Sequence, residues 1–594
     1  MCEGLGSKMA GSSQDVSGNK AGYATLQNIV SARGLHALPA VSLVAIPALC
    51  LWTTPNILTQ ASFVDPYIYT GYIYNSASLV SRFGTTYYAL RVAAIAPQQL
   101  AHWLLGPEAG YAVMRYLLLL AGCASIFAIV KRFFGVGAAL YSAALLAFAP
   151  WYLRSLTWEY VDGFASTYLL IGFAFILAPR RPTNLGYLCA GAFFALAANS
   201  NLYAIAIAAA FVPALAYLRF NDARARLSDH AAATVAGFLL TYALLAAVVH
   251  HTFPTLGLFF EAFTLHVARE LLSGGSQRWF QELKPYIAAG HYFVLVPFII
   301  FLAGSIYTAA IWTDAAAAQS RKAVAAFTGS LGIVIALYLI NHYAFHSPRI
   351  TRFYYFSYAS IPSYLALSAM IGAAAQRLPP KLSAMALSCA ATLSLLIWLL
   401  NGAASLYAYF SYLLFAVTTA LFLLGAATAR RWPIVALSSA CIFGAALPGF
   451  FYHSGSPYRE LQSRTQAVDE RDVYSGTLHL IKVVERSAPP SAGPIAFWYD
   501  ATLPAHSWLS SVQSAYLFWS SKLPSPAPAV DEKNQAVLRE KKILVLLGLG
   551  EAEIADYEKA LAAANVGFAV RRSGEYRGAR LHYRYAILGL FPNP

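Results

Sequence analysis

The sequence predicts an α-helical membrane protein that crosses the bilayer about thirteen times and ends in a small α/β soluble domain. Of its 594 residues, 58% are hydrophobic and only 11% are charged, whereas about one quarter of the residues in soluble domains are charged. The mean hydropathy is +0.54. Apolar stretches of the ~20 residues that a helix needs to cross a hydrocarbon core recur from about residue 37 to about residue 452.

Hydropathy divides this stretch into thirteen expected spans. Their approximate ranges are 37–53, 111–130, 135–152, 163–178, 185–200, 202–219, 231–249, 291–312, 323–343, 354–373, 382–400, 403–427 and 433–452. The spans that meet near residue 200, at Asn-Ser-Asn, and those that meet near residue 401, at Asn-Gly, can each also be read as one long bent segment.

The loops between the spans indicate the orientation. If the polar segment 1–36 is cytoplasmic, six successive inner loops carry basic residues: Lys131 and Arg132, Arg180 and Arg181, Arg219 with Arg224 and Arg226, Arg321 and Lys322, Arg377 with Lys381, and Arg430 and Arg431. Cytoplasmic loops of membrane proteins have this excess of positive charge. The clusters account for most of the net charge of +15, so no nucleic-acid partner is expected. An odd number of spans places the tail outside.

The tail, residues 453–594, has the charge and pattern of a soluble domain. A buried strand is expected at 541–549, a helix at 551–564 and further strands at 566–570 and 582–588. The chain therefore divides into a cytoplasmic segment (1–36), a multi-span membrane region (37–452) and a non-cytoplasmic α/β domain (453–594). Six cysteines occur without a CxxC pair and none lies in the tail, so neither disulfides nor a thiolate metal site is expected.

Two long outer connections, about 54–110 and about 250–290, contain aromatic stretches of helical period, which are typical of helices lying in the membrane interface. Ionisable residues outside and near the membrane are the candidates for chemistry, because the inner-loop charge bias does not explain them. They are Asp65, Arg82, Arg91, Arg154, Glu159, Asp162, His250, His251, Glu261, His266, Arg269, Arg278, Lys284, His342, His346, Arg349 and Arg352.

Asp65 lies just beyond the first span and is followed by Pro66, which suits the first turn of a helix. One reading is that Asp65 only caps that helix. The other is that it lines a polar cavity together with the tyrosines that follow it, of which Tyr69 and Tyr72 are candidates along with Arg82.

Glu159 and Asp162 lie at the outer mouth between the third and fourth expected spans, and their spacing of three places them on one helical face. A carboxylate at the edge of hydrocarbon is costly unless it is paired or lines water. The structural alternatives are a salt bridge from Glu159 to Arg154 and a cap at Asp162.

Arg349 and Arg352 lie one helical turn apart at the outer mouth of the tenth expected span. Two guanidinium groups at this spacing suit a phosphate. The alternative is that they reach toward lipid headgroups.

In order and sidedness these residues resemble the type C glycosyltransferase superfamily, with a layout similar to lipid A aminoarabinose transferases and protein O-mannosyltransferases. The resemblance rests on Asp65 in the first outer loop, Asp162 at the start of the fourth span, and the late Pro-Arg-x-x-Arg-x-x-Tyr with Arg349, Arg352 and Tyr355. The outward carboxy-terminal domain also agrees.

The resemblance implies an inverting sugar transfer from a polyprenyl-phosphate donor to a lipid, glycan or protein acceptor. Asp65 would act at the acceptor hydroxyl, Asp162 and Glu159 would be its electrostatic or metal-binding partners, and Arg349, Arg352 and Tyr355 would bind the donor. Many relatives have adjacent Asp and Glu where this chain has Asp65-Pro66. The sequence identifies no cofactor and leaves a divalent cation open. The resemblance favours a bacterial inner membrane with a periplasmic site.

Two other classes of function are compatible with a polytopic chain. A lipid or solute transporter would place ionisable residues near the bilayer midplane and show two related halves, whereas the candidates here lie at the outer ends and no repeat is evident. A non-catalytic assembly protein would make the outer acids and arginines dispensable.

Overall fold

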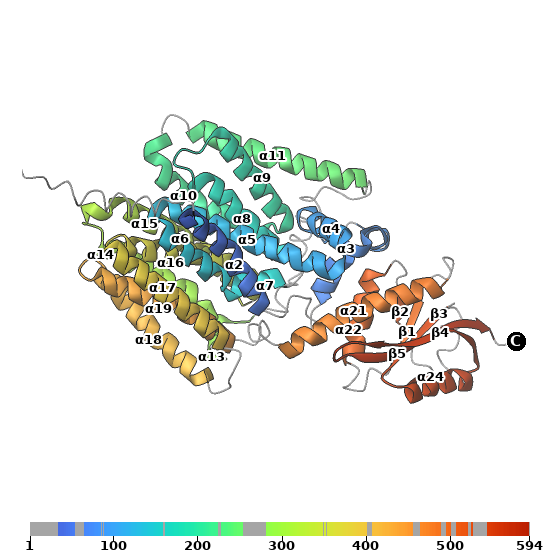
Figure 1. Cartoon of the computed structure of the whole chain (residues 1–594). Coiled ribbons are helices and arrows are strands. Elements are labelled where there is room, and N and C mark those ends of the chain that lie inside the picture. Colours follow the sequence, from blue (N-terminus) through green and yellow to red (C-terminus); the bar gives the residue numbers. More distant parts are fainter. Residues whose placement is uncertain are drawn as a thin grey trace, which may run out of the picture.

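The computed structural model describes residues 34–592 except 54–63, 85, 87, 158–160, 224–226, 253–280, 348–349, 352, 401–406, 455–463, 489–494, 500–506, 521–523 and 527–542. A helical bundle occupies one end of the molecule and a mixed sheet with its own helices the other (Figure 1).

Each of the thirteen expected spans coincides with a helix or with a bent pair of helices. They are α2 (Gly34–Thr53), α5 (Pro107–Phe134), α6 (Val136–Ala147) with α7 (Pro150–Thr157), α8 (Val161–Leu177), α9 (Asn184–Ser200), α10 (Tyr203–Ala223), α11 (Leu227–Thr252), α14 (Val296–Ala310), α15 (Ala318–Ala344), α16 (Phe353–Ala375), α17 (Pro380–Leu400), α18 (Tyr407–Thr428) and α19 (Pro433–Ser454). Near residue 200 the chain forms two helices rather than one bent segment. The pair near 401 meets outside the described residues.

Thirteen membrane crossings are not confirmed, because only some of these helices are long and apolar enough over their described residues. Among the described residues, six helices are long and apolar enough to cross a membrane, or seven if the α6–α7 pair, bent by 57°, counts as one span. Pro150 begins α7 directly after the break, and a proline cannot continue a preceding helix. Five further helices are apolar but too short over the residues whose side chains the structure describes.

Helix α16 is the centre of the bundle. The apolar window Phe356–Ala375 is buried over its whole length, and the helix packs against α5, α6, α7, α8, α14, α15 and α19. Its second half is rich in Ala, Ser and Gly, and such small residues allow membrane helices to approach closely.

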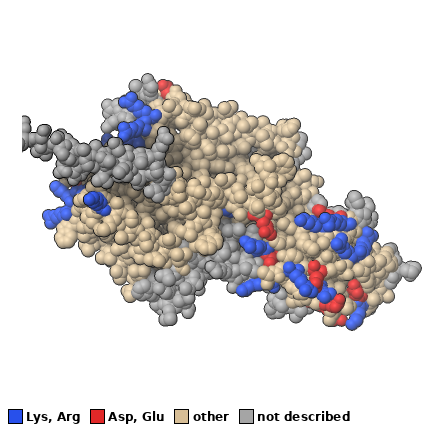
Figure 2. Space-filling view, viewed as in Figure 1, with Lys and Arg blue, Asp and Glu red and all other residues tan. Residues whose placement is uncertain are grey.

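Basic loops and the carboxy-terminal sheet lie at opposite ends of this bundle. Figure 2 shows Lys and Arg side chains at the bundle end farthest from the sheet, with an uncharged flank in between. At that end Arg377 forms an ion pair with Asp314, with 2.5 Å between Nη2 and Oδ2. This arrangement agrees with the orientation that the loop charges predict.

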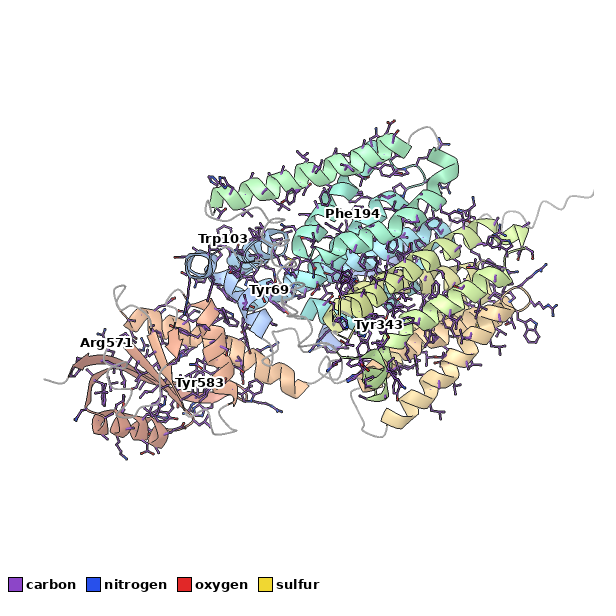
Figure 3. The ribbon with its side chains drawn as sticks, turned by 180° about the vertical axis from the view of Figure 1, so that it is seen from behind. Tyr69, Trp103, Phe194, Tyr343, Arg571 and Tyr583 are labelled. Atoms are coloured by element: carbon purple, nitrogen blue, oxygen red, sulfur yellow. The ribbon has the colours of Figure 1, made fainter. Side chains whose placement is uncertain are left out.

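Two helices of the first outer connection, α3 (Val64–Phe83) and α4 (Val92–Leu105), lie between the bundle and the sheet (Figure 1). Helix α4 buries Ala94, Gln98 and Ala101, whereas Trp103 is 79% exposed (Figure 3). One buried face and one exposed aromatic face suit the expected interfacial helix. In the second outer connection the structure describes α13 (Leu283–Ala288) and the short 3-10 helix η2 (Tyr292–Leu295).

The carboxy-terminal part is a five-stranded sheet in the order β2-β1-β3-β5-β4. Its elements are α21 (Arg464–Ser487), β1 (Ile495–Trp498), α22 (Ser507–Trp519), β2 (Pro524–Pro526), β3 (Ile543–Gly548), α24 (Glu551–Ala563), β4 (Val566–Arg577) and β5 (His582–Pro592). Strand β1 is parallel to β2 and β3, while β5 is antiparallel to β3 and β4. The strands and helix expected from residue 541 onward are confirmed.

Strand β3 explains why a continuous apolar run predicted a strand here. All six of its residues are buried. Ile543, Val545 and Leu547 pack in the core with α21 and α22, whereas Leu544 and Leu546 pack on the other face with α24. Helices cover both faces of the sheet, so the strand needs no polar alternation.

Candidate functional site

Asp162 is the centre of the candidate site. It is the second residue of α8, and its side chain is fully buried. Its Oδ1 accepts a hydrogen bond of 2.6 Å from Asn201 Nδ2 and one of 2.5 Å from the Tyr358 hydroxyl. A carboxylate out of contact with water is costly unless it is hydrogen-bonded, and these two donors from α16 and the end of α9 meet that need.

The local sequence explains how three helices converge on this carboxylate. A Cβ on Gly163 would lie 2.5 Å from the Ser155 carbonyl oxygen, so the glycine lets α8 begin in close contact with α7. Asn201 ends α9 in an extended conformation. Its Oδ1 accepts a hydrogen bond of 3.0 Å from the Tyr203 amide, while its Nδ2 is directed to Asp162. The turn between α9 and α10 therefore also positions the acid.

A buried arginine from the first outer connection lies at the same end of the bundle. Arg91 precedes α4, is only 5% exposed, and has its guanidinium carbon 5.5 Å from the centre of the Tyr69 ring. Arg91 and Asp162 are both close enough to Tyr358 to interact with it electrostatically. A buried cation and a buried carboxylate thus share Tyr358 as a neighbour.

Hydrogen bonds from the bundle hold this segment in place. Asn199 Oδ1 accepts from the Ala93 amide (2.8 Å), and Asn199 Nδ2 donates to the Leu90 carbonyl oxygen (3.2 Å). The hydroxyl of Tyr168 in α8 donates to the Ala93 carbonyl oxygen (3.0 Å). Arg91 lies between these anchors, so its backbone is fixed relative to α8 and α9.

Aromatic rings pack next to Tyr358 and along the same part of α16. Tyr203 packs edge-on against Tyr358, with ring centres 5.6 Å apart, and against Tyr338, with ring centres 5.5 Å apart. Phe356 packs against Trp151 at 5.0 Å. Such a wall keeps the local dielectric low, and charges within it interact more strongly than in water.

The remaining predicted residues are placed as follows. Asp65 is the second residue of α3, but its side chain lies outside the described residues. Tyr69 is buried beside Arg91 (Figure 3). Tyr72 is buried in another cluster with Leu90, and its hydroxyl lies 2.8 Å from Thr86 Oγ1. Burial raises the pKa of Tyr72, against the effect of that hydrogen bond.

Arg82 is exposed near the end of α3, with its guanidinium carbon 5.3 Å from the centre of the Phe83 ring. Tyr355 lies in the first turn of α16, three residues before Tyr358, and its side chain is not described. Glu159, Arg349 and Arg352 lie outside the described residues. In the chain, Arg349 and Arg352 come directly before α16, whose Tyr358 binds Asp162.

Sequence reasoning selected Asp162 but missed the residues that hold it. Asn201 and Tyr358 are ordinary polar residues in the sequence, and only packing brings them to the acid. Arg91 stood among the outer ionisable residues, but nothing local distinguished it from Arg82. An asparagine at both ends of a tight turn between two spans was the one available signal.

The described part of the chain, which excludes Glu159 and the side chain of Asp65, contains no group of three or more His, Cys, Asp or Glu side chains that would hold a metal ion. Around Asp162 the described donors are an amide and a phenol. These residues do not by themselves fit a divalent-cation site.

Comparison with known proteins gives no match to a family model and none to a curated protein by sequence. Among solved structures, the chain is similar to ArnT from Cupriavidus metallidurans bound to undecaprenyl phosphate, with 16% identity, a TM-score of 0.48, and coverage of 94% of this chain and 98% of that one.

It is also similar to the oligosaccharyltransferase AglB from Archaeoglobus fulgidus in complex with an inhibitory peptide and a dolichol-phosphate. Here the identity is 14%, the TM-score is 0.40, and coverage is 93% of this chain and 74% of that one. Both proteins have the type C glycosyltransferase fold that the sequence resembles. TM-scores below 0.5 mark a loose similarity that does not assign a residue, substrate or reaction to this chain.

Proposed function

We propose that the chain is a membrane glycosyltransferase that moves a sugar from a polyprenyl-phosphate donor to a lipid, glycan or protein acceptor on the outer side of the membrane. The observation that carries the proposal is the fully buried Asp162, which accepts hydrogen bonds from Asn201 and Tyr358 at the bundle end next to α3 and α4. Buried carboxylates that accept hydrogen bonds from fixed donors at a helix end are typical of functional sites.

In this proposal Asp65 is the general base. It takes the proton of the acceptor hydroxyl as that oxygen forms a bond to the anomeric carbon of the sugar, and the bond from that carbon to the phosphate oxygen breaks. The carbon is inverted and polyprenyl phosphate leaves. A base in hydrogen-bond reach typically contributes about 10²–10⁴-fold to such a rate.

Arginines stabilise the negative charge on the leaving phosphate. Arg91 is a described candidate, because it is buried beside Tyr69 and close enough to Tyr358 to interact with it electrostatically. Arg349 and Arg352 join it from the segment before α16. Guanidinium groups are suited to phosphate oxygens because their donors form a planar fork. Asp162 acts by fixing Tyr358 and by balancing this positive charge.

The position of the site also bears on the alternative of a transporter. Asp162 lies in the first turn of α8, at the end of the helix and not at its middle. A transporter of this size would be expected to place its binding residues near the bilayer midplane. We therefore favour transfer, with the site on the periplasmic face of a bacterial inner membrane.

The test is release of radiolabelled hexose from polyprenyl-phosphate hexose by the purified protein in detergent, with a panel of acceptors. We expect turnover by the wild type, and a loss of about 10²-fold or more in Asp65→Asn with donor binding kept. Asp556→Asn is the matched control, because that carboxylate is exposed on α24. Wild-type protein that neither binds nor consumes any of several donors would refute the proposal, and flux across proteoliposomes would then be measured.

A further inference from the structure

Helix α22 of the carboxy-terminal part lies against α3, the helix whose second residue is Asp65 (Figure 1). Trp519, at the end of α22, is 3% exposed and donates a hydrogen bond of 3.0 Å from its indole nitrogen to the Tyr67 carbonyl oxygen. Its ring packs against Tyr67, Tyr74 and Tyr474, with ring centres 6.2, 5.8 and 5.1 Å away. One indole therefore contacts both the start and the middle of α3.

The two helices approach closely enough to require a glycine. A Cβ on Gly71 would lie 2.7 Å from the Phe518 Cβ and 2.8 Å from the Phe518 carbonyl oxygen. At the residue directly after Tyr74 the helix is interrupted: Asn75 has non-helical angles (φ −144, ψ 39) and donates its side-chain amide to the Ser520 carbonyl oxygen. Helix α3 is thus kinked where it meets the end of α22.

Helix α21 adds two further contacts. The hydroxyl of Tyr474 is hydrogen-bonded to that of Tyr74, and Ser475 Oγ donates to Glu108 Oε1 at the start of α5 (2.6 Å). Tyr67 belongs to the same buried cluster as Tyr474 and Trp519. On the bundle side, Tyr69 of α3 lies against Arg91. Helix α3 is therefore held between the sheet and the bundle.

We propose that helices α21 and α22 of the carboxy-terminal part are a positioning element for α3, and that Trp519 is the residue that fixes the helix carrying Asp65. Tyr67, whose carbonyl oxygen receives the indole proton, follows Asp65 by two residues, which is about 3 Å along a helix. A shift of α3 at Tyr67 therefore shifts Asp65 by nearly the same amount. This proposal rests on the proposed function, because it gives Asp65 a role in catalysis.

The test compares three variants of the full-length protein. Trp519→Ala removes the ring and the donor, and Trp519→Phe keeps a ring but removes the donor. Trp498→Ala is the matched control: Trp498 lies in β1 and packs on Tyr557 of α24, with ring centres 4.1 Å apart, on the face of the sheet turned away from α3. It perturbs the same domain without touching α3.

We expect kcat to fall on the order of 10- to 100-fold in Trp519→Ala, since an error of about 1 Å in placing a reacting group costs this much. The KM for the donor should change less than about threefold, because the donor contacts lie on the bundle side. Trp519→Phe should recover part of the loss. Trp498→Ala should keep kcat near the wild-type value even where it lowers the melting temperature.

Hydrogen exchange of the amides in residues 64–83 separates this inference from the proposed function. Faster exchange of that segment in Trp519→Ala, but not in Trp498→Ala, supports the positioning role whether or not the wild type shows transferase activity. The positioning role of Trp519 is refuted if hydrogen exchange of residues 64–83 is unchanged in Trp519→Ala. It is also refuted if Trp519→Ala and Trp498→Ala lower kcat equally.

Two glycine-to-alanine variants provide a second check that does not remove a buried ring. Gly71→Ala should push α22 away from α3 and repeat the fall in kcat. Gly329→Ala in α15 is the control, because a Cβ there meets no atom within 4 Å. Equal activity in both variants would overturn the claim that close contact with α22 sets the position of α3.

Discussion

The two ends of the molecule differ in where their charged side chains lie. At the surface of the carboxy-terminal part, charged groups pair with one another: Arg577 pairs with Glu575 at 2.6 Å and Arg584 with Glu551 at 2.8 Å, and Figure 2 shows basic and acidic side chains intermingled there. A buried carboxylate of this part, Asp472 of α21, accepts hydrogen bonds from the backbone amides of Ala579, Arg580 and Leu581. At the neighbouring end of the bundle, Asp162 is fully buried and Arg91 is 5% exposed.

The difference is consistent with the proposal that the bundle end holds the reacting groups. Exposed ion pairs contribute little, about 0–1 kcal/mol, because water screens them. A buried charge in a helical bundle is costly and is kept only where its neighbours hold it in a fixed geometry. In our proposal the carboxy-terminal part positions the site, whereas the bundle end supplies the reacting charges. The predictions below test this division.

The largest expected effect on donor binding is at Arg91. Arg91→Ala should weaken binding of the polyprenyl-phosphate donor roughly 10- to 100-fold, the range for hydrogen bonds to charged groups. The donor affinity of Arg91→Lys should lie between those of the wild type and Arg91→Ala, because lysine keeps the charge but not the planar fork of donors. Donor affinity is measured by equilibrium binding in detergent.

Arg571→Ala is the control for that measurement, since Arg571 is exposed on β4 in the sheet (Figure 3) and should bind donor as the wild type does. Equal weakening at Arg571 and Arg91 would contradict the division between the two ends. Melting temperatures of all three variants show whether a loss of binding reflects a loss of fold.

A smaller effect is expected at Tyr358. Tyr358→Phe keeps the ring packed against Tyr203 but removes the hydrogen bond to Asp162. The Tyr358 hydroxyl acts on the reaction only through Asp162, so turnover should fall about tenfold, near the lower end of the roughly 1.5–3 kcal/mol that a hydrogen bond to a charged group contributes. Tyr364→Phe, another buried tyrosine of α16, is the control, and an equal loss there would show that the Tyr358 hydroxyl has no special role.

The sequence predicted the helices of the bundle well because apolar length is a local property. It also singled out Asp162 as a candidate, because a carboxylate beside hydrocarbon is unusual wherever it occurs. It could not predict Asn201 and Tyr358, which lie 39 and 196 residues from Asp162 in the chain. The contact between Trp519 and Tyr67 spans 452 residues. Such contacts depend on how the helices pack, and no local pattern records them.

The thirteen expected membrane crossings show what hydropathy does not distinguish. The expected ranges are helical, but α8 has only 17 residues and α6 and α7 are bent by 57°. Apolar composition indicates burial, and burial in the protein interior and burial in lipid give the same local signal. Helix length is what distinguishes them, and helix ends are the part of an element that a sequence defines least well.

The smallest expected effect lies where α4 of the bundle side meets α3 and α21. This contact, formed by His102, Tyr74 and Tyr474, is called the seam. His102 of α4 is 8% exposed, its ring centre is 5.4 Å from that of Tyr74, and Tyr74 in turn contacts Tyr474 of α21. Burial, and then the nearby positive charge of Arg115, lower the pKa of His102 to about 4 from its ordinary value of 6.5. The folded protein therefore holds this imidazole neutral over a range in which the unfolded chain protonates it.

Because the folded pKa lies below the unfolded one, the stability that depends on neutral His102 is complete above about pH 6.5 and decreases as the pH falls toward 4. Melting temperatures of the wild type in detergent should fall over this window, and His102→Asn should flatten the slope. His582→Asn is the control, because its side chain is 46% exposed. An unchanged slope in His102→Asn would show that the seam does not hold this imidazole neutral, and the seam would then be wetter than its packing indicates.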